Sequence, residues 1–198
     1  MGGIMSIILQ GSTSGSVTLQ EPAVAGTTVL TLPAVSGTVL TTGSSGQSIP
    51  KAALPTGSVL QVVQGTLSTA FSTTNTTLTD TGLSASITPT SSSSKILVVV
   101  NLNGVHNSTT NYNVYYTLLR NSTNLTNISN GSGWSIRTGQ NSGRWGSDSI
   151  TYLDSPSTTS STTYKVQIAS EGGGTTAFIG DVNSFNALST ITLMEIAA

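Results

Sequence analysis

The part of the chain after residue 58 alternates apolar and polar residues in short runs, which is the pattern of half-buried β-strands. In one run, Leu83, Ala85 and Ile87 alternate with Ser and Thr, and the run stops at Pro89. Turn-forming residues separate the runs. Eight such runs are predicted to form strands: residues 59–65, 83–89, 95–102, 112–121, 149–155, 163–170, 176–181 and 189–197.

The run KILVVVNL, residues 95–102, is almost continuously apolar. Its length and its three consecutive valines predict a central strand that is buried on both faces. Repeated short strands with turn residues between them are typical of antiparallel sandwiches. The pattern therefore predicts an all-β fold in which residues 59–198 form an antiparallel sandwich, with a jelly roll as the expected version.

The first 45 residues carry a short internal repeat instead. Pro22 and Gly26 both return eleven positions later, and two and a half such units fill residues 17–43. So few units cannot close a core by themselves. We expect residues 1–45 to form an extended β anchor that wraps together with the same segment of other copies, and a flexible tether is the alternative. Residues 46–58, rich in Pro and Gly, are predicted to be a linker.

Composition narrows the class of protein. Charged residues make up 7% of the chain, against about 25% in a typical soluble domain. Six Lys and Arg residues cannot form the basic surface that binds nucleic acid, and no apolar run reaches the ~18 residues of a membrane helix. The chain has no cysteine, so disulfides and thiolate metal sites do not hold the fold. We therefore expect no nucleic acid and no membrane insertion, and a weakly charged surface that suits a larger assembly.

Four stretches resemble proteins of a known class. GSVTLQEPAVAGTTVLTLPAVSGTVLTT resembles the short repeat of tail-fibre and other virion proteins of tailed bacteriophages. ITPTSSSSKILVVVNLNGV, TYLDSPSTTSSTTYKVQI and STITLMEIAA resemble the C-terminal domain that often accompanies this repeat. That domain is similar to the trimeric jelly rolls of the TNF/C1q type and to viral fibre knobs.

The resemblance implies a homotrimeric structural protein on the virion surface. It would join other virion proteins through residues 1–45 and present residues 59–198 as an outward knob that attaches to the host. Tail fibres are usually much longer and have a dedicated docking domain, so a capsid spike or cement protein is an equally open version. A lectin-like carbohydrate-binding module outside a virion is a second class of function, and a hydrolase is a third.

Ionisable residues are too few and too scattered to predict an enzyme. The single histidine, His106, is expected at the surface, in a loop after a strand. EGGG, residues 171–174, is expected to be a hairpin turn and not a phosphate loop. We expect no catalytic residue, no cofactor and no metal. Four aspartates at apparent strand ends are expected to bond to turn backbone in preference to calcium: Asp80, Asp148, Asp154 and Asp181.

The longest stretch without a strand pattern, residues 129–148, holds both tryptophans and two of the three arginines. Trp and Arg are enriched in binding hot spots, and the face of Trp stacks on sugars or receives Arg. This stretch is therefore the candidate site for a host-surface glycan. The alternative is that both tryptophans fill a core or a subunit interface. The candidate residues are Trp134, Arg137, Arg144 and Trp145.

Overall fold

The computed structural model of the chain describes residues 6–10, 13–14, 16–20, 54–109, 112–126, 134–137, 146–172, 174–182 and 185–198. Every regular element in these ranges is a β-strand and every strand pairing is antiparallel, which confirms the all-β class. The chain divides into two compact units, residues 1–48 and 49–198. Most of the predicted linker, residues 46–53, lies outside the described ranges.

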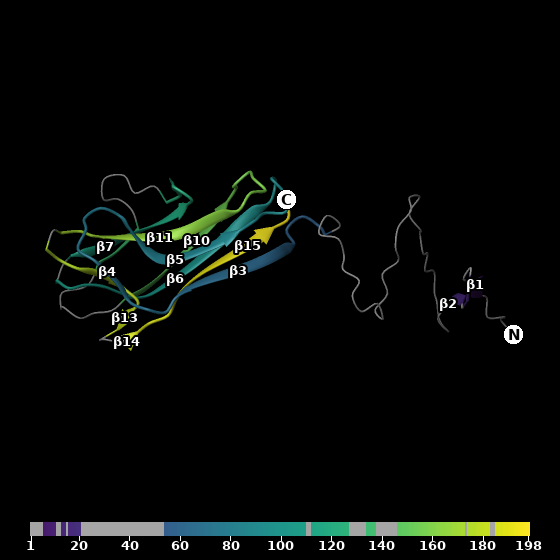
Figure 1. Cartoon of the computed structure of the whole chain (residues 1–198), viewed down its shortest axis with the longest axis horizontal. Coiled ribbons are helices and arrows are strands. Elements are labelled where there is room, and N and C mark those ends of the chain that lie inside the picture. Colours follow the sequence, from purple (N-terminus) through teal and green to yellow (C-terminus); the bar gives the residue numbers. More distant parts are fainter. Residues whose placement is uncertain are drawn as a thin grey trace. The chain divides into compact units, whose positions relative to one another are not determined.

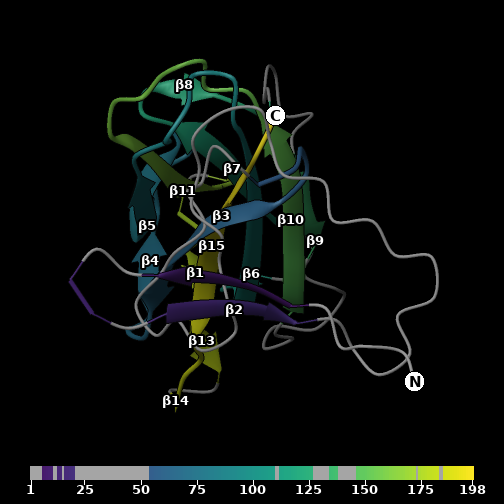
Figure 2. The same cartoon turned by 90° about the vertical axis from the view of Figure 1, so that its right-hand side faces the viewer.

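The described part of the first unit is a β-hairpin (Figure 2). Strand β1, Ser6–Gln10, pairs with β2, Ser16–Gln20, along their whole lengths. Ile8, in the middle of β1, is 56% exposed. The remainder of the eleven-residue repeat, residues 21–45, lies outside the described ranges. The repeat structure therefore stays a prediction.

The second unit consists of two antiparallel sheets in a sandwich-like arrangement (Figure 1). The β6 sheet has the strand order β3-β15-β6-β12-β4, with β10 also paired to β6. The β11 sheet has the order β5-β11-β7-β8, with β9 also paired to β7, and β13 and β14 form a small ribbon. The bounds are β3 Val59–Leu67, β4 Phe71–Thr73, β5 Thr79–Ile87, β6 Lys95–Asn107, β7 Asn113–Arg120, β8 Thr123–Asn124, β9 Trp134–Arg137, β10 Gly146–Asp154, β11 Thr162–Ser170, β12 Ala177–Ile179, β13 Asp181–Val182, β14 Phe185–Asn186 and β15 Ser189–Ile196.

The longer strands of the second unit pair in a nested order once the strands of two or three residues are set aside. The eight longer strands, called the main strands below, are β3, β5, β6, β7, β9, β10, β11 and β15. The first, β3, pairs with the last, β15, and the second, β5, pairs with the seventh, β11. Inside these, β6 pairs with β10 and β7 pairs with β9. Successive strands of this set lie in opposite sheets, except β7 and β9, which both belong to the β11 sheet.

The hydrophobic core lies between the two sheets. On β5, Leu83, Ala85 and Ile87 are buried while their neighbours are exposed, as the alternation in the sequence predicts. The inward residues of β11, Tyr164, Val166 and Ile168, are also buried, which confirms that prediction as well. The opposite wall is formed mainly by β6 and β15, through Ile96, Val98, Val100, Leu102, Ile191 and Leu193.

The prediction that residues 95–102 form a central strand buried on both faces is right about the position of β6 but wrong about the burial of its outer face. It is central, because it pairs with β15 along one edge and with β10 along the other. Its inward residues are fully buried, but the outward Leu97 and Val99 are only half-buried and Asn101 is exposed. The reason is that the described part of this chain leaves the outer face of the β6 sheet partly open.

The EGGG segment does not form the predicted hairpin turn. Both edges of β11, which precedes it, are already occupied by β5 and β7. Strand β12, which follows it, pairs with β6 and β4 in the other sheet. A turn in which the Thr175 amide donates to the Gly172 carbonyl, at 3.2 Å, instead carries the chain across the sandwich.

Candidate functional site

The structure places only part of the predicted glycan site. Trp134 and Arg137 are the first and last residues of β9, opposite Tyr116 and Asn113 of β7. The predicted irregular stretch is thus shorter than expected, because it contains β9 and the start of β10. Arg144 and Trp145 lie outside the described residues. The grouping of the four side chains therefore stays a prediction.

His106 is not the surface loop residue that the sequence predicts. Strand β6 extends to Asn107, and His106 within it is only 8% exposed. Its ring stacks on Phe178 of the adjacent β12 with the centroids 4.4 Å apart, and its Nε2 lies 3.8 Å from Oδ2 of Asp181. Burial lowers the pKa of His106, so the imidazole is neutral at pH 7. The side chain belongs to the packing between strands.

Asp154 anchors a buried polar cluster and does not stabilise a turn as predicted. Its carboxylate, 5% exposed, receives Nη1 of Arg120 at 2.9 Å from each oxygen and the Tyr164 hydroxyl at 2.6 Å. Burial, reinforced by this hydrogen bond, raises the pKa of Tyr164, so the phenol stays protonated and donates. The arrangement neutralises a buried charge between the two sheets.

Asp80 and Asp148 also bond across strands. On β5, Asp80 receives Nζ of Lys165 at 2.8 Å, and this hydrogen bond is the largest cause of its lowered pKa. On β10, Asp148 accepts a hydrogen bond from the Tyr116 hydroxyl, which crosses from the β11 sheet. Asp148 also accepts from the amide of Ser149 at 2.7 Å, but both residues lie inside β10 and not in a turn. The turn interpretation is therefore wrong for both Asp80 and Asp148.

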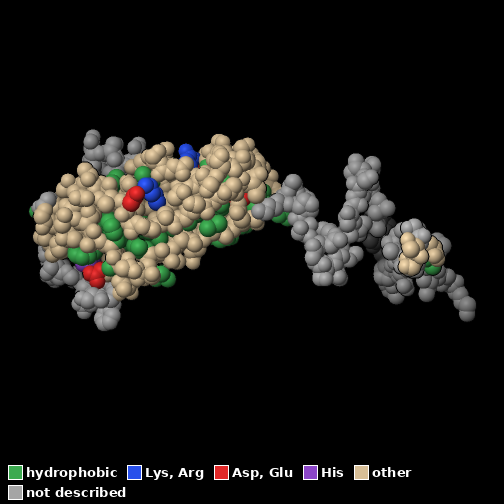
Figure 3. All heavy atoms as spheres, viewed as in Figure 1, with side chains coloured by type: hydrophobic (Ala, Val, Ile, Leu, Met, Phe, Trp, Pro, Cys, Tyr) green, Lys and Arg blue, Asp and Glu red, His purple; other side chains and the backbone are tan. Residues whose placement is uncertain are grey.

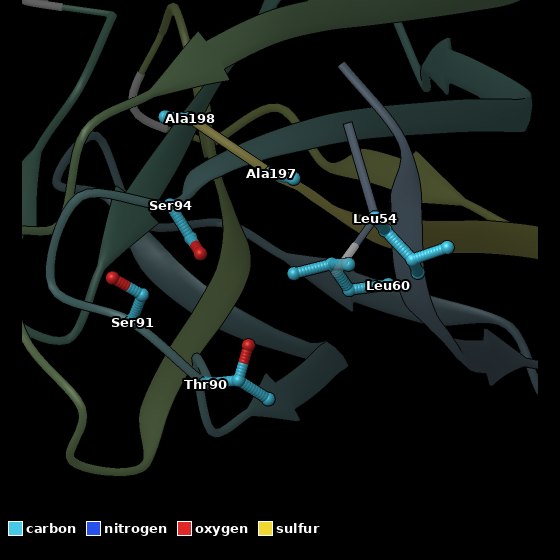
Figure 4. Close-up of a pocket in the computed structure, with 7 residues that line it drawn as sticks. All are labelled: Leu54, Leu60, Thr90, Ser91, Ser94, Ala197 and Ala198. Atoms are coloured by element: carbon cyan, nitrogen blue, oxygen red, sulfur yellow. The ribbon is translucent and has the colours of Figure 1, made fainter. Parts of the chain in front are cut away.

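A pocket of about 420 Å³ opens where the chain enters the sandwich from residue 54 (Figure 4). Its walls combine aliphatic and hydroxyl side chains, and none of the described residues that line it is charged. The Thr90 hydroxyl donates to Glu195 at 2.7 Å, and the Ser91 hydroxyl bonds with that of Ser93 at 2.9 Å, so these groups are already used by the protein. The lining residues are Leu54, Leu60, Thr90, Ser91, Ser94, Ala197 and Ala198.

Glu195 lies behind this pocket and is fully buried. It receives the amide and the hydroxyl of Thr90, each at 2.7 Å, and the side-chain amide of Gln61 at 2.6 Å. Burial alone would raise the pKa of Glu195, but these hydrogen bonds to the ionised form outweigh it and lower the pKa. A buried carboxylate held by neutral donors is a structural anchor for the end of β15.

Acid is therefore expected to destabilise the sandwich. The pKa of Glu195 is lower in the folded chain than its ordinary 4.5, so its stabilising contribution is present above pH 4.5 and is lost as the pH falls through the folded value. His106 also makes the folded chain less stable as the pH falls below 6.5, its ordinary pKa, because protons bind more readily to the unfolded chain.

The variant E195Q tests this role of Glu195. The donors that bind the carboxylate would then face a side-chain amide, and the free energy of unfolding should fall by about 2 kcal/mol at pH 7. Melting temperatures between pH 7 and pH 3 should converge for E195Q and the wild type, and parallel curves would contradict this assignment.

Comparison with known proteins does not identify the chain. It matches no protein-family model, and no curated protein sequence is significantly similar to it. In the described ranges, no helix is long and apolar enough to cross a membrane, and no three His, Asp or Glu side chains gather where they could hold a metal ion. A functional assignment therefore rests on the residues and strand order of this chain.

Proposed function

We propose that the chain is a structural protein of a tailed bacteriophage, displayed on the virion surface as a homotrimer with a jelly-roll knob. The nested strand order carries this proposal. Pairing of the first main strand with the last, the second with the seventh, the third with the sixth and the fourth with the fifth is the order of an antiparallel ribbon rolled into two sheets. This order supports the jelly roll, a fold of capsid and lectin domains.

The hairpin of the first unit supports an anchoring role for residues 1–45. A two-stranded hairpin alone in water is marginally stable at best, so β1 and β2 need a further partner. This segment has one charged residue, Glu21, so its copies would repel one another little. We propose that residues 1–45 associate with one another and with another virion protein of the capsid or tail.

Labelling of purified particles tests the assignment. Antibodies raised against residues 54–198 should decorate phage particles in electron micrographs. Many labels spread over the head would indicate a capsid spike or cement, and a few labels at the tail would indicate a fibre. Particles without label would contradict the virion assignment and favour the lectin-like module.

Removal of residues 1–48 tests the anchor. The second unit has its own core between two sheets, so the truncated chain should keep its strand content and a cooperative melting transition. It should no longer join the particle when it is supplied to phage that lack the full-length protein. Quantitative blotting of purified particles measures this, and incorporation at the full-length level would contradict the anchor.

The proposed glycan contact is tested at Trp145. If Trp145 stacks on sugar, W145A should leave the melting temperature nearly unchanged and reduce adsorption of particles to cells, because three copies on one axis contribute avidity. If Trp145 fills a core or an interface, the same change should cost about 3–5 kcal/mol of stability. S86A, on the outer face of the β11 sheet, is the matched control and should change neither property.

A further inference from the structure

The outer face of the β6 sheet includes three rows of side chains that run across four adjacent strands, β3, β15, β6 and β10. Strand register defines each row, because residues paired across strands point to the same side. The core-facing residues between these positions are buried on β6 and β15, so the rows point away from the core. The rows are Val62–Met194–Leu97–Leu153, then Gln64–Thr192–Val99–Thr151, then Thr66–Thr190–Asn101–Ser149.

The first of these rows is entirely apolar and remains open to solvent in the described part of the chain. At its two ends, Val62 is 57% exposed and Leu153 is 59% exposed. Between them, Met194 and Leu97 are half-buried, and Val99 continues the apolar surface into the second row. A contiguous apolar stripe from one edge strand to the other is more than the scattered exposure that is normal on a monomer.

The outer face of the β11 sheet carries polar and charged side chains instead. It carries the ion pair between Asp80 and Lys165, and Gln167 donates to Asp80 at 2.7 Å. The hydroxyls of Ser86 and Thr163 bond to each other at 2.7 Å on the same face. These are the side chains of a solvated surface, so the two outer faces of one sandwich are built for different surroundings.

We infer that the apolar row on the β6 sheet is the surface through which knobs of identical chains pack together. This rests on the proposed function, of which it specifies the trimer contact. None of the twelve positions in the three rows is charged, so a second copy brings few charges to this surface. The next outward residue of β6 beyond Leu97 is Lys95, whose Nζ donates to the Ser155 hydroxyl at 2.7 Å. The row reaches both edge strands, and a neighbour can therefore approach from the side and close a ring. Charged side chains are also sparse among the described residues on the side of the molecule drawn in Figure 3, in keeping with the 7% of charged residues in the chain.

The other end of the same face is polar. A shallow hollow of about 270 Å³ lies there, lined by Asn101, Asn103, Ser147, Asp148 and Ser149. Small polar side chains around a hollow hold water well and pack poorly against an apolar partner. We therefore expect the tight contact between copies near Leu97, toward the start of β6, and water in the hollow near Asn103.

Thiol reactivity in the full-length protein tests this surface, because the natural chain has no cysteine. L153C places a single thiol in the apolar row, and S86C places one on the solvated face as the matched control. At a concentration where light scattering shows an oligomer, L153C should react with a maleimide at least tenfold more slowly than S86C. Dilution to a mass near the monomer's 20.1 kDa should remove the difference.

A second variant identifies what covers the thiol. L97D adds a charge at the centre of the row, and in the L97D/L153C chain the thiol should react as fast as in S86C. Circular dichroism checks that this chain is folded, and if it is not, the dilution series on L153C alone decides. A thiol that is fast in the oligomer would overturn the inference and leave the trimer proposal standing. A thiol that stays slow in a 20.1 kDa monomer would show that the chain's own segment covers the face, and this would also overturn the inference. Absence of an oligomer at every concentration would instead contradict the trimer proposal.

Discussion

G65V is expected to abolish folding of the second unit. Gly65 of β3 lies where the edges of the two sheets meet, and a Cβ added there would collide with the backbone carbonyl of Ser84 on β5 and lie 3.1 Å from Cγ2 of Ile191. Backbone cannot move aside without separating β3 from β15 or β5 from β11. We expect a loss of about 4 kcal/mol or more, a size reserved for a few severe mechanisms.

The Gly65 prediction is measured by urea unfolding followed by circular dichroism. G65A tests the same collision with a single methyl group and should also be severely destabilised. G57A is the matched control, because nothing lies within 4 Å of its added Cβ, while its φ of +89° still strains an L-residue. G57A should cost about 1–2 kcal/mol. Equal stability of G65A and the wild type would show that the sheets do not approach at this edge.

D154A is expected to be the most damaging change of a polar side chain. It removes the carboxylate that receives Arg120 and the fully buried Tyr164, and leaves a cation and a hydroxyl without that acceptor. Breaking a buried pair in this way costs about 3–5 kcal/mol. The free energy of unfolding measures the loss.

The control for Asp154 is the exposed ion pair between Asp80 and Lys165. D80A should cost less than about 1 kcal/mol, because solvent screens a surface pair. The ratio of the losses in free energy of unfolding for D154A and D80A shows how far the Asp154 cluster is shielded from solvent. Similar losses for D154A and D80A would mean that the Asp154 cluster is hydrated and does not close the core.

Strand positions were the part of this fold that the sequence could predict. Alternation at β5 and β11 needs only local information, since side chains in a strand point to opposite faces in turn. The end of β6 could not be found in this way, because its last residues are polar. Asn107 is 1% exposed and donates to Ser170 and Thr175 at 3.1 and 3.3 Å, so hydrogen bonds compensate a burial that hydropathy does not predict.

Side-chain contacts between the two sheets could not be predicted from local sequence patterns. Asp154 meets Arg120 across a separation of 34 residues and meets Tyr164 from another sheet, and no spacing in the sequence marks this cluster. The hairpin predicted at the turn after β11 was wrong for the same reason, because a Gly-rich sequence does not indicate which sheet the chain enters next. Leu97 and Val99 did carry a signal, because their apolar character implied a covering layer. The sequence could not say whether that layer is this chain or another.

The nested strand order also governs when the knob can fold during synthesis. Strand β15 lies between β3 and β6, yet it is made after every other strand of the two sheets. Until it emerges, β3 has no partner strand and part of β6 has an open edge, so a nascent chain presents edges that pair with other chains. Pairing across such long sequence separations is also slow. The two sheets of the second unit therefore close only after β15 has been synthesised, and until then the open strand edges need protection from aggregation.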